Sequence, residues 1–349
     1  SGGKLQIKKC EGSDVATIFM SKAESTPWGG FVIQGKDSQL VAAHTIFLWS
    51  GSSDAQPIDG DHKRGLGHRN DVPLISVSFH GYVQIESSQL VYGAGQAIVA
   101  STGASVDINY SLIQGFACGL QCNNASVHID SSIFREFPLR EQGRSGDPIN
   151  KLEYTDSDHD AMYIVGGNVS ISKSAVGFAM DDCIDSGTGP GGYMKISGTY
   201  VQSCYHEGIA LSDNGFNVPK TVHIEQVIVE DCQQGIELGF STHLHTVYVE
   251  NVIFSSNYVG LRIGDNYGWQ VDGMLVCNRC LFHDNVIGIL DLHATQFGPL
   301  TNNLIVRNSL LQPNDIHGNP NAFNVKSSVL GMSHIQIDGW MNPAVQTTF

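Results

Sequence analysis

The sequence predicts an all-β chain that forms one domain, a right-handed parallel β-helix. Short strands with alternating apolar and polar residues recur every 22–28 residues, Gly, Asn, Asp and Ser separate them, and no helical periodicity is present. Six segments align in one register: His159–Ile164, Asp181–Ser186, His206–Leu211, Gln233–Leu238, Tyr258–Ile263 and Val286–Asp291. Their first residues differ by 22, 25, 27, 25 and 28 positions, so each repeat is interpreted as one coil of a solenoid.

A second strand follows in each repeat. Its copies are Val83–Glu86, Val106–Asn109, Val127–Asp130, Val169–Ser172, Met194–Ser197, Val222–Glu225 and Val247–Glu250. One coil cannot bury its apolar face alone, so the coils are expected to stack. Equivalent residues then form columns, in which successive residues lie about 4.8 Å apart. Met162, Ile184, Ile209, Ile236, Leu261 and Ile289 are predicted to form one inward column. Right-handed winding is expected because parallel crossovers have that hand.

The predicted solenoid spans residues 28–335. Residues 1–27, which include the strand Leu5–Lys8, are expected to cap its first coil, since an open end would expose core and edge strand. Residues 138–158 interrupt the coil spacing as an insertion, and residues 336–349 form a C-terminal tail.

Composition narrows the class of partner. The net charge of −15 opposes nonspecific binding to nucleic acid phosphates, and no apolar run is long enough to be a membrane-spanning segment. Eight cysteines and the sequons at Asn109, Asn124 and Asn168 are compatible with an extracellular or cell-surface protein. Cys277 and Cys280 are expected to be buried or disulfide-linked, since no second pair completes a zinc site.

Stacking the coils also brings polar residues together. The predicted columns are Asp160, Asp182, Glu207 and Gln234; His159, Asp181, His206, Gln233 and Tyr258; and Tyr163, Asp185, Ala210, Glu237 and Arg262. Any single aspartate in a solenoid turn is usually structural. Carboxylates on neighbouring coils, however, raise one another's pKa values unless a proton, a cation or a substrate relieves them, so this patch is the candidate site.

At these residues the sequence resembles the polygalacturonase-type glycosidases, which are parallel β-helices. Asp181-Asp182-Cys183 matches that family's Asp-Asp-Cys motif, while Asp158-His159-Asp160-Ala161 and His206-Glu207-Gly208 are similar to its Asn-Thr-Asp-Gly and Gly-His-Gly motifs. The Arg-Ile-Lys motif has no equivalent in register; Leu261-Arg262-Ile263 lies one coil later and lacks the lysine. The resemblance covers residues 158–263.

The resemblance implies an inverting glycoside hydrolase without a cofactor, acting on a polysaccharide or oligosaccharide. Asp181 would be the general acid, and Asp160 with Asp182 would hold the attacking water, chemistry that needs a carboxyl separation of roughly 6.5–9.5 Å. Substrate would contact His159, Asp185, His206, Glu207, Gln234, Glu237, Tyr258 and Arg262. Arg140, Arg144 and Lys151 of the insertion could replace the missing lysine in binding an acidic glycan. The resemblance also pairs Cys183 with Cys204 in a disulfide.

Two other classes fit the same patch. In a polysaccharide lyase or uronate epimerase, Asp160, Asp182, Asp185 and Glu207 would hold calcium, and Arg262, Tyr163 or Tyr258 would remove the proton. Carboxylates with histidines could also bind a transition metal. The third class is a non-catalytic surface or adhesion module, whose first coil would begin near Trp28-Gly29-Gly30-Phe31.

Overall fold

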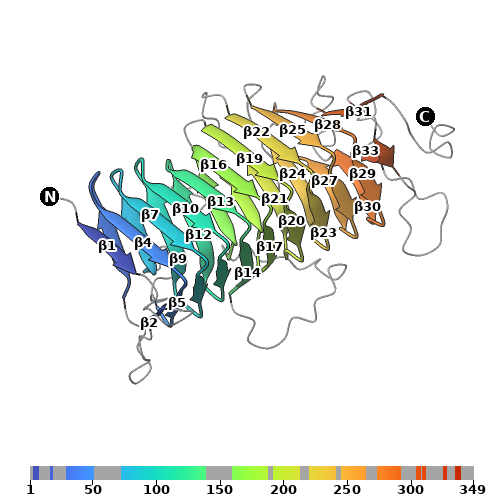
Figure 1. Cartoon of the computed structure of the whole chain (residues 1–349). Coiled ribbons are helices and arrows are strands. Elements are labelled where there is room, and N and C mark those ends of the chain that lie inside the picture. The colour runs from blue at the N-terminus through green and yellow to red at the C-terminus, as the bar shows by residue number, and fades with distance from the viewer. Residues whose placement is uncertain are drawn as a thin grey trace.

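Residues of alternating polarity wind into a right-handed parallel β-helix with three sheets (Figure 1). This computed structural model describes residues 3–7, 16–18, 29–50, 72–138, 159–187, 192–212, 220–240, 245–264, 273–291, 304–307, 309–311, 325–327 and 335–338. Of the predicted insertion 138–158, the residues after 138 therefore lie outside the described part.

The strands of the three sheets have the following bounds. The first sheet has 12 strands: β1 (Lys4–Ile7), β4 (Gln39–Ala43), β7 (Tyr82–Glu86), β10 (Ser105–Asn109), β13 (Ser126–Asp130), β16 (Gly167–Ser172), β19 (Gly192–Ser197), β22 (Lys220–Glu225), β25 (Thr246–Glu250), β28 (Met274–Asn278), β31 (Leu304–Arg307) and β34 (Ile335–Asp338). The second sheet has 11: β2 (Ala16–Ile18), β5 (Thr45–Leu48), β8 (Gln89–Val91), β11 (Leu112–Gln114), β14 (Ile133–Phe137), β17 (Ala175–Ala179), β20 (Tyr200–Gln202), β23 (Ile228–Glu230), β26 (Ile253–Ser255), β29 (Leu281–His283) and β32 (Leu310–Leu311). The third sheet has 11: β3 (Phe31–Gln34), β6 (Ile75–Ser78), β9 (Gln96–Ser101), β12 (Cys118–Asn123), β15 (Met162–Val165), β18 (Ile184–Ser186), β21 (Glu207–Ser212), β24 (Gln234–Gly239), β27 (Val259–Ile263), β30 (Ile287–Asp291) and β33 (Val325–Ser327).

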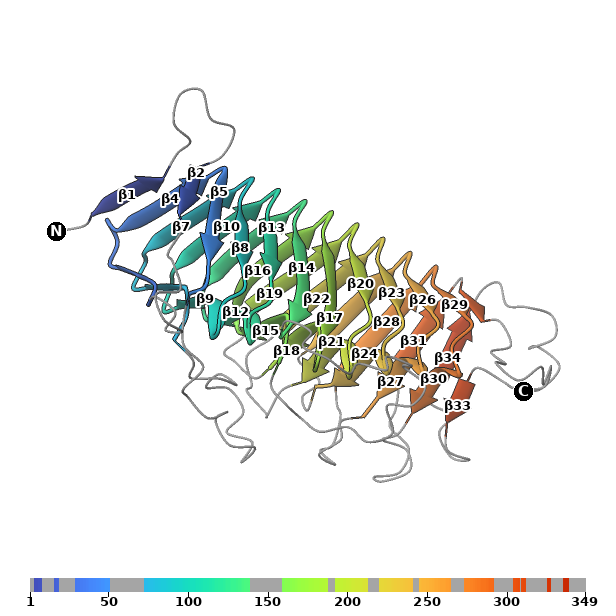
Figure 2. The same ribbon diagram turned by 90° about the horizontal axis from the view of Figure 1, so that it is seen from below.

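Strand order shows how the chain visits these sheets. Neighbours within a sheet are three strands apart in sequence, so each coil gives one strand to each sheet before the next coil stacks on it (Figure 2). The pairings of the third sheet, such as β21 with β24, are parallel and hold the register of the repeat alignment. The predicted fold class is confirmed.

The inward column predicted from the sequence forms the core beneath the third sheet. Met162 pairs with Ile184, Ile184 with Ile209, and the pairing continues through Ile236, Leu261 and Ile289. All of these side chains are fully buried. Beneath the second sheet, the rings of Phe254 and Phe282 stack with centroids 4.6 Å apart, so the core is a series of like-on-like layers.

One position before the inward residue, four successive coils have a glycine, and close backbone contact explains it: Gly208, Gly235, Gly260 and Gly288. A Cβ atom on Gly235 would lie 2.4 Å from the carbonyl oxygen of Gly260, and one on Gly260 would lie 2.6 Å from the oxygen of Gly288. Real Cβ atoms do not approach oxygen this closely. Consecutive coils therefore require glycine here.

A ladder of hydroxyl groups joins the coils at the bend between the first and second sheets. The backbone N–H of Ser88 donates to Ser111 Oγ, that of Ser111 to Ser132 Oγ, and that of Ser132 to Ser174 Oγ, each at 3.1 Å. The residue before each of these serines has positive φ, as at Tyr110. The bend turns N–H groups away from the sheets, and the hydroxyls satisfy them.

The third sheet differs from the first in that its outward side chains are buried. Strands of the first sheet alternate between buried and exposed residues, as in β13, whereas nearly every residue of β12, β21, β24 and β27 is buried. The outward side chains of the third sheet are mostly polar, and this is where the predicted polar columns lie. The fold thus places charged groups out of contact with water.

At the two ends, strands that lie before residue 28 or extend beyond residue 335 continue the first and second sheets. β1 pairs with β4, β2 pairs with β5, and β34 pairs with β31, each in parallel. The first two are the end strands of their sheets.

Candidate functional site

Two of the predicted catalytic aspartates bind the backbone of the coil that follows them. Asp160 Oδ1 accepts a hydrogen bond from the backbone N–H of Asp182 at 3.2 Å, and Asp182 Oδ1 accepts one from the backbone N–H of Glu207 at 2.7 Å. Asp160 is 1% exposed and Asp182 7%. These bonds fix the position of each carboxylate, and they confirm that the column Asp160, Asp182, Glu207 runs across three coils.

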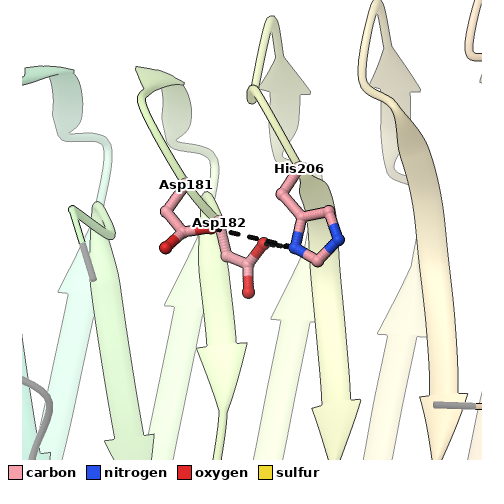
Figure 3. A group of neighbouring side chains, drawn as sticks. All are labelled: Asp181, Asp182 and His206. Carbon is pink, nitrogen blue, oxygen red and sulfur yellow. Dashed lines mark ion pairs between the residues drawn. The ribbon is translucent and has the colours of Figure 1, made fainter. Parts of the chain in front are cut away.

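His206 lies at the centre of an acidic cluster with Asp181, Asp182 and Glu207. Its Nδ1 is 3.4 Å from Asp182 Oδ1, 3.8 Å from Asp181 Oδ1, and in contact with Glu207 Oε2. Figure 3 shows Asp181 and Asp182, from the turn before β18, pointing toward His206 of the next coil. One ligand atom from each of Asp181, Asp182 and His206 lies within 4.8 Å of the others, a spacing at which a cation could be held.

Burial and mutual repulsion divide the carboxyl groups of this acidic cluster into two kinds. Burial, followed by the negative charges of Asp182 and Glu237, raises the pKa of Glu207 well above its ordinary value. Burial is also the largest influence on Asp182 and works to raise its pKa, but hydrogen bonds from Glu207 and His206 outweigh it and lower that pKa. The proton is therefore held on Glu207 in preference to Asp182.

A second group of buried polar side chains joins this cluster from the following coils. Arg262 NH1 donates to Gln234 Oε1 at 2.8 Å and lies 3.2 Å from Glu237 Oε2. The amide nitrogen of Gln234 lies 3.4 Å from His206 Nε2. Gln234, Glu237 and Arg262 are each no more than 5% exposed. The structure thus connects Arg262 on β27 to His206 through one amide.

The outward column predicted on the third sheet is present. Tyr163 pairs with Asp185, Asp185 with Ala210, Ala210 with Glu237, and Glu237 with Arg262. Asp185 is 6% exposed and Tyr163 is 1% exposed. The column follows the same coils as the acidic cluster.

His159 and Tyr258 occupy the margins of the site. His159 Nδ1 lies 2.7 Å from the carbonyl oxygen of Ala117, on the preceding coil. Tyr258 lies one coil beyond Gln233 and is half-buried; its backbone N–H donates to Cys232. Arg140, Arg144 and Lys151 lie outside the described residues, so their predicted part in binding remains a prediction.

Sequence reasoning missed the extension of the outward column toward the N-terminus. Gln121 on β12 pairs with Tyr163, and its Oε1 accepts a hydrogen bond of 2.6 Å from Gln96. Both glutamines are buried. Continuing the repeat alignment one coil upstream, to Leu120-Gln121-Cys122, would have found Gln121.

A buried lysine was missed as well. Lys220 Nζ donates to Ser186 Oγ and lies 5.6 Å from the ring centroid of Phe240. In the register of the first sheet, Lys220 pairs with Gly192, which pairs with Gly167. The sequence signal for this lysine was its alignment with glycines in the two preceding coils. Its ammonium group lies at the corner between the third and first sheets.

The cysteine predictions agree with the structure. Cys183 and Cys204 form a disulfide with Cα atoms 5.5 Å apart, directly beside the acidic cluster. Cys277 and Cys280, which were expected to be either buried or disulfide-linked, form a second disulfide. Cys118, Cys122 and Cys232 are buried thiols.

Comparison with known proteins found similar solved structures at low sequence identity. No protein-family model matches the chain, and no curated protein matches it. Among solved structures, the chain is similar to the mannuronan C-5 epimerase AlgE4 A-module of Azotobacter vinelandii, with a TM-score of 0.36, 10% identity, and coverage of 87% of this chain and 88% of that one. It is also similar to the Dettilon tailspike protein, with a TM-score of 0.35, 12% identity, and coverage of 86% of this chain and 62% of that one. No helix in the described residues has the length and apolarity to cross a membrane.

Proposed function

We propose that this protein is an extracellular carbohydrate-active enzyme that hydrolyses an acidic polysaccharide. The observation that supports this proposal is the buried acidic cluster of Asp181, Asp182, His206 and Glu207 on two adjoining coils of a parallel β-helix. Burying charged side chains is expensive unless they are paired or functional, and clustered carboxyl groups with divided proton affinity suit acid–base chemistry. Two disulfides fit an oxidising compartment.

In the proposed mechanism, as in the polygalacturonase-type enzymes that the sequence resembles, Asp181 protonates the leaving glycosidic oxygen. Asp160 and Asp182 orient the attacking water, and their bonds to the next coil hold their carboxylates in place. Asp160 or Asp182 acts as the base and takes a proton from the water. As the water oxygen bonds to the anomeric carbon, the glycosidic bond on the opposite side breaks, so the product has inverted configuration. The buried cation Arg262, held between Gln234 and Glu237, supplies positive charge close to this centre.

A second candidate is a cation-dependent lyase or epimerase acting on a uronate. The observation that favours it is the compactness of the cluster, because ligand atoms of Asp181 and Asp182 lie within 4.8 Å of one another. This spacing is shorter than the roughly 6.5–9.5 Å between the carboxyl groups of an inverting glycosidase. It suits a cation bound by oxygen ligands, with Asp160, Asp185 and Glu207 close by in the columns described above.

The first experiment is an activity screen against acidic and neutral polysaccharides, with and without chelator, followed by single substitutions. Asp160→Asn, Asp181→Asn and Asp182→Asn should each lower turnover about a hundredfold or more, as expected when a general acid or base is removed. Asp130→Asn is the matched control, since Asp130 lies on β13 of another sheet. It should leave turnover unchanged.

Product chemistry separates the two candidates. A hydrolase gives saturated products of inverted configuration in the presence of chelator. A lyase gives products that absorb in the ultraviolet, an epimerase changes the sugar without cleaving the chain, and chelator stops both when they need a cation. Full activity in all three aspartate variants would refute the assignment of the site.

A further inference from the structure

In the contact between Gln234 and His206, the donor and the acceptor can be assigned. Arginine has only donors, so the Gln234 amide atom that faces Arg262 NH1 at 2.8 Å must be the oxygen. The other end of the same amide, its NH2 group, then faces His206 Nε2 at 3.4 Å. The orientation of an amide is normally an assumption, but here the chemistry of the guanidinium group determines it.

A neutral imidazole has one nitrogen that donates and one that accepts. Because Nε2 faces a donor, it takes the acceptor role, and the ring proton resides on Nδ1. Nδ1 is the nitrogen that contacts Glu207 and lies 3.4 Å from Asp182 Oδ1 and 3.8 Å from Asp181 Oδ1. The ring therefore directs an N–H group, and not a lone pair, into the acidic cluster.

We infer that Gln234, held by Arg262, is a positioning residue that keeps the neutral His206 in the tautomer with its proton on Nδ1. Gln234 is 5% exposed and Arg262 is 5% exposed, so water does not compete strongly for either end of the amide. Residues that orient a functional imidazole through its second nitrogen are a general device of active sites and metal sites. The role of this tautomer in catalysis rests on the proposed function, whereas the tautomer itself does not.

Two consequences for the site follow from this tautomer. The Nδ1–H group can hydrogen-bond to Asp182 and so stabilise negative charge on one of the carboxyl groups proposed to orient the water. The same N–H group opposes binding of a metal through His206 Nδ1, although Asp181, Asp182 and His206 are close enough together. The wild-type arrangement thus favours proton-based chemistry, and a change at Gln234 should alter that preference.

The test is nitrogen NMR of the full chain labelled with 15N-histidine, at a pH where the rings are neutral. Loss of one signal set in His206→Ala assigns His206 among the 14 histidines, and the exposed His44 serves as an internal reference. In the wild type, Nδ1 should be the protonated nitrogen. Gln234→Glu puts a carboxylate acceptor beside Nε2 and should move the proton to Nε2. Gln234→Leu, which has neither a donor nor an acceptor, should leave a mixture of tautomers.

A second readout is binding of Zn2+ measured by calorimetry. Moving the proton to Nε2 frees the Nδ1 lone pair, so Gln234→Glu should raise affinity about 10–100-fold, the usual range for a residue that orients a ligand. The double variant Gln234→Glu/His206→Ala corrects for the added charge and should lose the gain. The inference is overturned by a wild-type ring with its proton on Nε2, by a ring protonated on both nitrogens, or by a gain in affinity that survives in the double variant. None of these outcomes depends on turnover of a glycan, so they remain distinct from failure of the proposed hydrolase.

Discussion

Asp160 and Asp182 combine two tasks in one side chain. Each belongs to the acidic column, and each also accepts a backbone N–H group of the following coil. The accepting oxygen is what the fold needs, while the negative charge is what the proposed chemistry needs. Substitutions that separate oxygen from charge should therefore separate stability from activity.

For Asp182, the replacements Asn and Ala should behave differently. Asp182→Asn keeps an oxygen acceptor for the backbone N–H of Glu207 and should lower the free energy of unfolding less than Asp182→Ala does. Asp182→Ala leaves that buried N–H without its acceptor and should lower the free energy of unfolding by about 1–3 kcal/mol. Urea denaturation followed by circular dichroism measures both. Equal destabilisation by the two variants would show that charge, and not the acceptor, supports the fold at this position.

At the residue scale, the sequence predicts which side chains share a column but not how they meet. Period-two strands and fixed spacing are enough to place Asp185, Glu237 and Arg262 in one outward column, as the structure confirms. The contact of His206 with Glu207, and the orientation of Gln234, depend on rotamers chosen in a buried site. Those choices follow from three-dimensional packing, which the pattern of residue types does not specify.

At the scale of the strands, the glycines of the third sheet, Gly208, Gly235, Gly260 and Gly288, allow the coils to stack closely. Gly235→Ala would bring a Cβ atom to 2.4 Å from the Gly260 carbonyl oxygen and 3.1 Å from the ring of Phe254. Because the first of these atoms is backbone, relief requires coils to move apart, and we expect the free energy of unfolding to fall by about 1–3 kcal/mol.

The matched control for this variant is Gly29→Ala, where nothing lies within 4 Å of the added methyl group. Thermal and urea unfolding of both proteins checks the prediction. A Gly235→Ala protein as stable as the wild type would mean that the coils are less tightly stacked than the structure shows.

The positions of the strands can be predicted from the sequence, whereas the hydrogen bonds at the bends between strands cannot. Alternating apolar residues identify β10, β13, β16, β19, β22 and β25 directly. The hydroxyl ladder through Ser88, Ser111, Ser132 and Ser174 was not predicted. Serine is common in turns of every kind, so its presence does not predict a ladder. What directs each serine N–H toward the next hydroxyl is the left-handed conformation of the residue before it. Residues such as Tyr110 adopt this conformation without a local sequence signal.

At the scale of the whole molecule, each described strand pairs only with the strand of the coil before it and the strand of the coil after it. In all three sheets the order of strands is the order of the coils. Stability in such an array is a sum of coil and neighbour terms, so terminal coils, which have one neighbour, should open more readily than central coils.

Hydrogen exchange with mass spectrometry tests this expectation. The slowest exchange should be found in the central strands of the first sheet, β16, β19 and β22, and faster exchange toward β1 and β34. The exposed N–H groups of turns within each coil serve as internal references for unprotected exchange. Equal protection from end to end would indicate that the solenoid opens only as one unit, contrary to the nearest-neighbour picture.

The two ladders have opposite directions along the chain, and this has a consequence for assembly. In the hydroxyl ladder, an earlier coil donates its N–H to a later side chain, as from Ser88 to Ser111. In the acidic ladder, a later coil donates to a side chain already in place, as from Glu207 to Asp182. In both ladders the bond forms only after the later coil has been translated. Until then, the earlier coil has an N–H group without its acceptor in the hydroxyl ladder and a carboxylate without its donor in the acidic ladder. The last coil of a growing β-helix therefore has an unsatisfied donor at one corner and an unsatisfied acceptor at the other, and the next coil satisfies both.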